Sequence, residues 1–94
     1  GLYFELSEYA VGLAMKLKKA LTEMGVPFQA DSPSNQQFPV LPNTVVEQLN
    51  AKGYEFEIDH PVDEDHTCIR LVTSWATPEK NVDALCNALK KLYL

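Results

Sequence analysis

The chain has 94 residues, of which 46% are hydrophobic and 22% charged, and this composition is typical of one compact globular domain. Its formal net charge is −5 and its few basic residues form no cluster, which argues against a protein that binds nucleic acid through the phosphates. No apolar run approaches the ~20 residues that a membrane-spanning helix needs. We therefore expect neither nucleic acid nor a membrane as a partner.

The first expected element is an amphipathic helix from Tyr3 to Met24. Its apolar side chains recur at steps of three and four residues, the spacing that places them on one helix face: Leu6, Ala10, Leu13, Ala14, Leu17, Ala20, Leu21 and Met24. Gly25 follows directly, at the position where a glycine most often ends a helix. The sequence thus predicts a long helix with one buried face.

A hairpin is expected next, with strands at Val26–Ala30 and Gln36–Leu41 and a polar turn at Asp31–Asn35. Pro39 lies within the second strand. Because proline has no N–H to donate to a neighbouring strand, this strand should lie at an edge of the sheet or end early.

A short helix of about nine residues should follow Pro42. Asn43 is the expected N-cap, since its side chain can accept a hydrogen bond from the first helical turn. Gly53 is placed to end this helix after Lys52.

Two antiparallel strands are expected after this helix, joined by the charged turn 61–66. Tyr54–His60 alternates apolar and acidic residues, the pattern of a half-buried strand. In the strand Thr67–Ser74, alternate side chains point to opposite faces. One face carries Ile69, Leu71 and Thr73, and the other carries Cys68, Arg70, Val72 and Ser74.

The last element should be a helix that runs to Leu92, with Thr77 as N-cap and Pro78 at the first helical position. The order is then α-β-β-α-β-β-α. We predict a single α+β domain over residues 1–94, with an antiparallel sheet of about four strands and helices mainly on one face. Ile69 and Leu71 should lie against the helices, and the face that bears Arg70 should have no cover within this chain.

Arg70 is the only arginine, and the strand pattern places it in the middle of a strand. Its planar guanidinium can hold a carboxylate or phosphate through two parallel hydrogen bonds. The simpler alternative is an ion pair with an acid of the neighbouring strand, for which Glu55, Glu57 and Asp59 are available.

The residue patterns of common catalytic sites are absent from the sequence. It contains no Gly-rich phosphate loop, no nucleophile elbow and no paired His and Cys with a third orienting group. We interpret His60 and His66 as solvated turn residues and expect no metal site. Cys68 and Cys86 are expected to be buried free thiols, which suits a reducing cytoplasm.

Polar and aromatic residues near the strand ends remain candidates for an interface or the wall of an active site: Asn35, Gln36, Gln37, Ser74 and Trp75. For the three amides the alternative is an ordinary polar loop. For Trp75 the alternative is a side chain that caps the core.

Two segments, Ser32–Pro39 and Ile69–Thr77, resemble the C-terminal small domain of the low-specificity L-threonine aldolases. These enzymes are beta-eliminating lyases that depend on pyridoxal phosphate (PLP) and have the aspartate-aminotransferase-type fold. The resemblance spans essentially the whole chain, although Ser74 stands where several members have a histidine.

The resemblance implies an enzyme that cleaves β-hydroxy-α-amino acids, such as threonine, to glycine and an aldehyde, here acetaldehyde. It implies that Arg70 binds the substrate α-carboxylate. It also implies that the Schiff-base lysine and the other PLP-binding groups lie in a large domain of the same chain, in a parent that forms homo-oligomers. We therefore expect no catalytic residue, bound PLP or activity in this fragment alone.

Two other functions stay open at this point. The chain could be an independent α+β module that binds a small ligand or a partner protein. It could also be the small domain of another PLP enzyme, an aminotransferase or a tryptophanase-like lyase, because a carboxylate-binding arginine does not distinguish reaction types.

Overall fold

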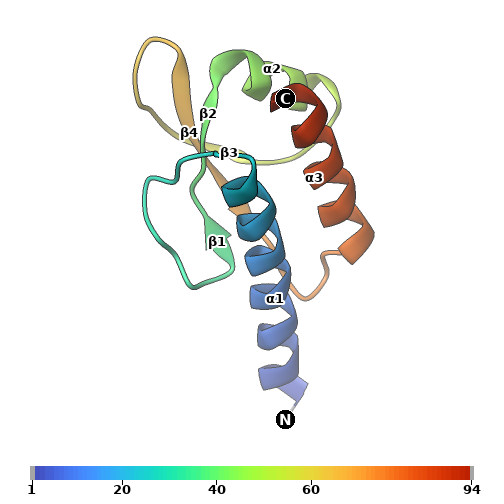
Figure 1. The fold of residues 1–94 in the computed structure, drawn as a ribbon. Helices are drawn as coiled ribbons and strands as arrows, with labels where there is room; N and C mark the ends of the chain where they lie inside the picture. The colour runs from blue at the N-terminus through green and yellow to red at the C-terminus, as the bar shows by residue number, and fades with distance from the viewer. Residues whose placement is uncertain (1, 94) are drawn as a thin grey trace.

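The computed structural model describes residues 2–93, apart from the side chain of Tyr3 (Figure 1). This part of the chain forms α1 (Leu2–Glu23), β1 (Gln36–Gln37), β2 (Val40–Pro42), α2 (Asn43–Ala51), β3 (Glu57–Pro61), β4 (His66–Val72) and α3 (Glu79–Tyr93). The predicted element order and the α+β class are confirmed. Among these described residues, no helix is both long enough and apolar enough to cross a membrane.

β4 is the central strand of the antiparallel sheet. β1 and β2 pair with it one after the other along one edge, and β3 pairs with it along the opposite edge. All pairings of β4 are antiparallel, including the predicted one with β3. Every other strand is therefore positioned by β4, which carries Arg70.

The predicted hairpin forms only in part. Both β1 and β2 come from the segment expected to be its second strand, and Pro39 separates them. The expected first strand is reduced to one bridge, Phe28 to Pro39, with a backbone hydrogen bond from Gln29 N–H to the Phe38 carbonyl (2.9 Å). Pro27 and Pro39 each lack the N–H that a regular ladder requires, which explains why the pairing stops there.

The helices cover one face of the sheet, and α1 and α3 lie side by side across it (Figure 1). Ile69 and Leu71 of β4 point into this layer, as the alternation predicted. The core consists of apolar side chains from all three helices, from β4 and β2 and from the turn after α1: Leu13, Leu17, Leu21, Val26, Leu41, Val45, Val46, Leu49, Ile69, Leu71, Val82 and Leu89.

Glycine ends the first two helices, as predicted. Gly25 (φ +82°) and Gly53 (φ +88°) have left-handed backbone conformations that other residues rarely adopt. After α2, the N–H of Gly53 bonds to the Asn50 carbonyl (3.0 Å) and the N–H of Tyr54 bonds to the Leu49 carbonyl (3.2 Å). These two bonds form a Schellman motif.

The two predicted N-caps were wrong. Asn43 is the first residue of α2, after Pro42, and its side chain makes no cap bond. Instead its amide donates to the Glu64 carbonyl (3.0 Å) and accepts from the Thr67 hydroxyl (2.6 Å), which ties α2 to the β3–β4 turn. Thr77 lies two residues before α3, and its hydroxyl accepts a hydrogen bond from the Ser74 N–H (2.9 Å).

The outer face of the sheet is covered unevenly. Val72 is exposed and Arg70 is half-buried, in agreement with an open face at that end of β4. Cys68, on the same face, is completely buried, so the expectation of no cover within the chain was wrong at this position. The Cys68 thiol lies 3.8 Å from the Phe38 carbonyl oxygen, where the chain between β1 and β2 passes β4.

Candidate functional site

The candidate site is built around Arg70 on the outer face of β4. In the register of the sheet, Arg70 lies directly opposite Glu57 of β3, and the two side chains form an ion pair. Of the three acids considered from the sequence, Glu57 is therefore the partner. The Glu57 side chain is 68% exposed, so the contact lies at the surface.

The nitrogen atoms of the Arg70 guanidinium differ in their hydrogen bonding. Its Nε atom is buried and has no hydrogen-bond partner among the described residues. Its terminal nitrogen reaches Glu57, and the side chain as a whole is 37% exposed. A buried donor without a partner is costly, so a ligand that reached Nε as well as the terminal nitrogen would satisfy it.

An open depression of about 340 Å³ surrounds this guanidinium. It is lined by Glu55, Phe56, Glu57, Arg70 and Val72. Phe56 and Val72 supply apolar surface beside the single positive charge. This combination suits a small molecule with a carboxylate and a short apolar part.

A second hollow, of about 350 Å³, lies between the first half of α1 and the segment after β4. It brings together three of the residues predicted as an interface or active-site wall, namely Asn35, Ser74 and Trp75. Four residues of α1 complete its lining: Leu6, Ser7, Ala10 and Val11. This contribution could not be predicted from the sequence, because the α1 residues have only the ordinary pattern of an amphipathic helix.

Hydrogen bonds fix the segment that carries this hollow. The Asn35 amide donates to the Thr73 carbonyl (2.8 Å), and the Thr73 N–H donates to the Asn35 carbonyl (3.1 Å). The buried Thr73 hydroxyl donates to the Ala10 carbonyl of α1 (2.5 Å). Trp75 is 67% exposed, so the interpretation of Trp75 as a cap on the core was wrong.

Gln36 and Gln37 lie on opposite faces of the sheet. Gln36 is paired with Val72 and shares the outer face with Arg70, whereas Gln37 is paired with Leu71 on the core face. Gln37 is fully buried, and its amide donates to the carbonyls of Ser32 (2.9 Å) and Ser34 (3.1 Å). Gln37 thus holds the loop before β1 and lines neither of the two hollows.

The two free cysteines are poor candidates for nucleophiles. Burial raises the pKa of the Cys68 thiol, and the Asp59 carboxylate raises it further. Burial also raises the pKa of the half-buried Cys86 thiol. Both thiols are therefore protonated near neutral pH, whereas nucleophilic cysteines need a lowered pKa. Cys68 is buried as predicted, and Cys86 only in part.

The lysines do not form a site that fits PLP by themselves. A PLP lysine must be able to lose its proton inside a pocket. Lys16 instead bridges α1 to α3 through Glu79 (3.0 Å) and Asp83 (2.5 Å), and these acids raise its pKa above the usual value. Lys18 pairs with Asp31. The remaining lysines lie exposed on the surface: Lys19, Lys52, Lys80, Lys90 and Lys91.

The informative comparison for this chain is with solved protein structures. Neither a protein-family model nor a curated protein matches the chain. A solved structure of Leishmania major threonine aldolase matches 99% of it, with 35% sequence identity and a TM-score of 0.94. This similarity supports a threonine aldolase C-terminal domain. It spans 27% of the length of that Leishmania chain.

Proposed function

We propose that this chain is the small domain of a threonine aldolase, a PLP-dependent lyase. The reaction would be cleavage of a β-hydroxy-α-amino acid, such as threonine, to glycine and acetaldehyde. The observation that carries the proposal is the match to Leishmania major threonine aldolase over 99% of the chain. PLP, when bound in such an enzyme, serves as the electron sink for the bond that breaks. In this proposal PLP and its lysine belong to a part of the parent outside these 94 residues.

Arg70 would bind the α-carboxylate of the amino acid substrate. Its position in the central strand supports this role, because a strand holds a side chain more rigidly than a loop. The unpartnered Nε and the terminal nitrogen, on a side chain that is 37% exposed, would supply the two parallel donors that a carboxylate accepts. The contact of the Glu57 carboxylate with the terminal nitrogen supports a carboxylate as the group that Arg70 would bind.

Orientation is what such a contact would contribute to the reaction. A bidentate clamp fixes the plane of the carboxylate and with it the rotation about the adjacent bond of the amino acid. The bond to be broken would then be held in one orientation toward the cofactor. Positioning of this kind lowers the activation barrier and does not itself transfer a proton.

Replacement of Arg70 tests this role in the full-length enzyme. Losing one charged bidentate contact removes on the order of 2–5 kcal/mol of transition-state binding, so Arg70→Ala should lower kcat/KM for threonine roughly 30- to 5,000-fold. Arg70→Lys should recover only part of this loss, because an ammonium lacks the planar fork. The exposed Lys52 provides a matched control, and Lys52→Ala should leave kcat/KM unchanged. An unchanged kcat/KM in Arg70→Ala would reduce Arg70 to a surface ion pair.

The substrate class is tested separately. The rival PLP enzymes, an aminotransferase and a tryptophanase-like lyase, would share the arginine but act on other amino acids. Assays of the full-length enzyme with threonine, serine and aromatic amino acids should give glycine and acetaldehyde from threonine as the preferred reaction. Preferential turnover of an aromatic amino acid would favour one of the rival PLP enzymes. It would not contradict the proposed role of Arg70, because those enzymes share the arginine.

We further propose that the large domain of the parent chain packs against this domain, in a homo-oligomeric enzyme of the cytoplasm. Phe4 and Trp75 are 63% and 67% exposed, and such large apolar side chains are common at interfaces. Both cysteines are free thiols, which favours a reducing compartment. The alternative is an independent binding module, which would need no such neighbour. An upstream reading frame that encodes no lysine-bearing PLP domain would favour this alternative.

A further inference from the structure

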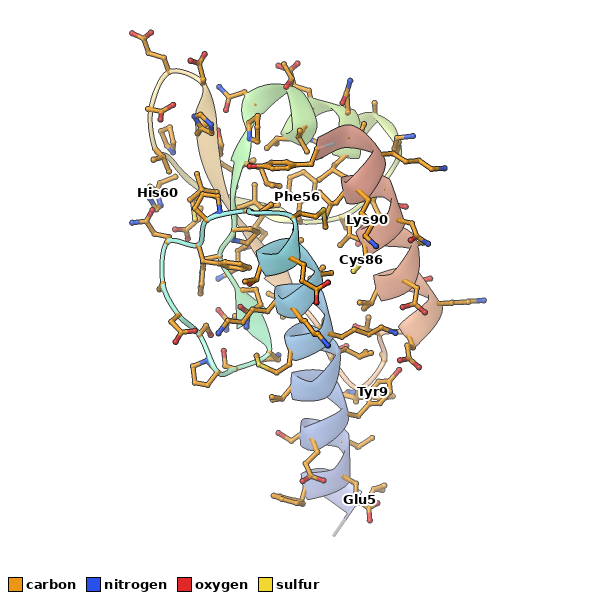
Figure 2. The ribbon with its side chains drawn as sticks, in the orientation of Figure 1. Glu5, Tyr9, Phe56, His60, Cys86 and Lys90 are labelled. Atoms are coloured by element: carbon orange, nitrogen blue, oxygen red, sulfur yellow. The ribbon has the colours of Figure 1, made fainter. Side chains whose placement is uncertain are left out.

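Three side chains that bind metals come together on the outer face of the sheet, away from the helices. They are Asp59 and His60 of β3 and Cys68 of β4, and their ligand atoms all lie within 4.8 Å of one another. The His60 Nδ1 atom lies 2.7 Å from a carboxylate oxygen of Asp59. Figure 2 shows His60 on the opposite side of the molecule from Cys86 and Lys90 of α3.

A β-bulge in β3 produces this arrangement. Ile58 pairs with Ile69 and His60 pairs with Cys68, so Asp59 is an extra residue on the β3 side. In a regular strand Asp59 and His60 would point to opposite faces. A bulge lets two successive residues oppose one residue of the partner strand, and bulges often re-aim side chains at functional sites. Here it places Asp59 and His60 on the face that carries Cys68.

The geometry points to a binding site for Zn²⁺. We propose that Asp59, His60 and Cys68 bind one Zn²⁺ ion through a carboxylate oxygen, an imidazole nitrogen and the thiolate sulfur. These three groups are the ligands that zinc prefers in proteins, and three protein ligands leave the fourth tetrahedral position for water. The cysteine thiol loses its proton to solvent when the metal binds.

Only small side-chain movements are needed to close the site. Zinc–ligand bonds of about 2.0–2.3 Å place neighbouring ligand atoms of a tetrahedral site roughly 3.5 Å apart. Cys68 is fully buried and fixed by β4, so it would serve as the stationary ligand. The side chains of Asp59 and His60 are 40% and 43% exposed, so they have room to turn toward it. The carbonyl oxygen of Phe38, 3.8 Å from the Cys68 sulfur, places further negative charge nearby.

A metal at this position would be close to the carboxylate-binding arginine. Cys68 and Arg70 are two residues apart on the same face of β4, a separation of about 7 Å along an extended strand. The ion would join the bulge of β3 to β4 next to the pairing of Glu57 with Arg70. The site itself does not depend on the proposed lyase function.

Cobalt substitution tests the site in the full-length protein. After the protein is stripped of metal with a chelator, Co²⁺ should produce a thiolate-to-cobalt charge-transfer band and the visible absorption of a tetrahedral site, and Zn²⁺ should displace both signals. Cys68→Ser should abolish the charge-transfer band. His60→Ala and Asp59→Asn should each weaken Co²⁺ binding by at least about tenfold, since even supporting groups around a metal contribute that much. His60 lies at the surface, so its variant tests the site even if Cys68→Ser fails to fold.

The chain offers matched controls. His66 at the start of β4 and Asp63 of the adjoining turn form a second His–Asp pair (2.9 Å), and Cys86 provides a second thiol on α3. His66→Ala and Cys86→Ser should bind Co²⁺ as the wild type does. A wild-type protein without the charge-transfer band, or a band that persists unweakened in His60→Ala, would overturn the proposal.

Discussion

Arg70 illustrates how far a single side chain can be interpreted from sequence and from structure. The alternation of residues along β4 predicted that Arg70 lies on the sheet face that points away from the core, and the structure confirms this placement. Its ion-pair partner could not be chosen from the sequence, because the expected neighbouring strand, Tyr54–His60, contains Glu55, Glu57 and Asp59 and the register depends on a bulge. The pairing of Glu57 with Arg70 settles the choice.

Glu57 should compete with substrate for Arg70. The pair is exposed and contributes about 0–1 kcal/mol, so Glu57→Gln should change the free energy of unfolding very little. If the guanidinium is the carboxylate site, freeing it should lower KM for threonine by up to about fivefold in the full-length enzyme. Steady-state kinetics check this expectation.

Glu55→Gln is the matched control for that measurement. Glu55 lines the same depression, whereas the ion pair that the structure describes for Arg70 is with Glu57. Its variant should leave KM close to that of the wild type. An equal fall in KM in both variants would point to a general effect of negative charge and not to competition at Arg70.

At the scale of helices and turns, glycine conformation makes a clear prediction. Gly53 has φ +88°, whereas Gly12 lies inside α1, where an added Cβ would have open space around it. Gly53→Ala should destabilise the chain by about 1–2 kcal/mol, because an L side chain is strained in the left-handed region. Gly12→Ala should instead stabilise it by about 0.5–1 kcal/mol, since alanine is the better helix former. Urea unfolding midpoints should therefore move in opposite directions.

The Asp63 carboxylate gives the turn between β3 and β4 a pH dependence. It accepts hydrogen bonds from the His66 ring (2.9 Å) and from the Asp65 N–H (2.8 Å). Both contacts lower the pKa of Asp63 below its usual 3.8, and the contact with His66 contributes most. A lowered pKa in the folded state means that the ionised carboxylate stabilises the fold above pH 3.8 and that this stabilisation is lost as the pH falls through the folded-state pKa.

Acid unfolding of Asp63→Asn checks this linkage. The variant should be less stable than the wild type above about pH 4, and the difference should shrink as the solution becomes more acidic. Asp65→Asn, on the same turn, serves as the control for a general change of charge. A stability difference that stays constant from neutral to strongly acidic pH would contradict the role assigned to Asp63.

Hydrophobic spacing predicted the elements better than local turn chemistry predicted their ends. The core face of α1 and the faces of β4 followed from periodicity, because burial of apolar surface decides them. Asn43 and Thr77 were assigned as caps from residue type alone, yet their side chains bind to the β3–β4 turn and to Ser74. These partners are contributed by tertiary structure, which local sequence does not reveal. The hollow beside Trp75 escaped prediction for the same reason.

Large apolar side chains are exposed at the surface of the molecule, as is common where a domain contacts another part of a protein. The N-terminal turns of α1, with Glu5, project beyond the body of the domain (Figure 2). Leu2 and Phe4 on these turns are 72% and 63% exposed, and Trp75 is exposed beside the hollow that α1 lines. These apolar surfaces are consistent with the proposed contact to the rest of the parent chain.

The isolated 94-residue chain should neither bind PLP nor catalyse cleavage of threonine. Its lysines lie in surface ion pairs or in solvent, whereas the lysine that binds PLP must lie inside a pocket. Mixed with PLP and freed of unbound cofactor by gel filtration, the chain should show no visible absorbance of an internal aldimine. A yellow protein after this treatment would refute the expectation.

The most direct test of the central claim compares two substrates that differ only in the group that Arg70 is proposed to bind. Full-length wild type and Arg70→Ala are assayed with L-threonine and with L-threoninamide, in which a neutral amide replaces the carboxylate. Arg70→Ala should lower kcat/KM for threonine roughly 30- to 5,000-fold and change that for threoninamide by less than about threefold. Equal losses for both substrates, or no loss for either, would contradict a carboxylate clamp at Arg70.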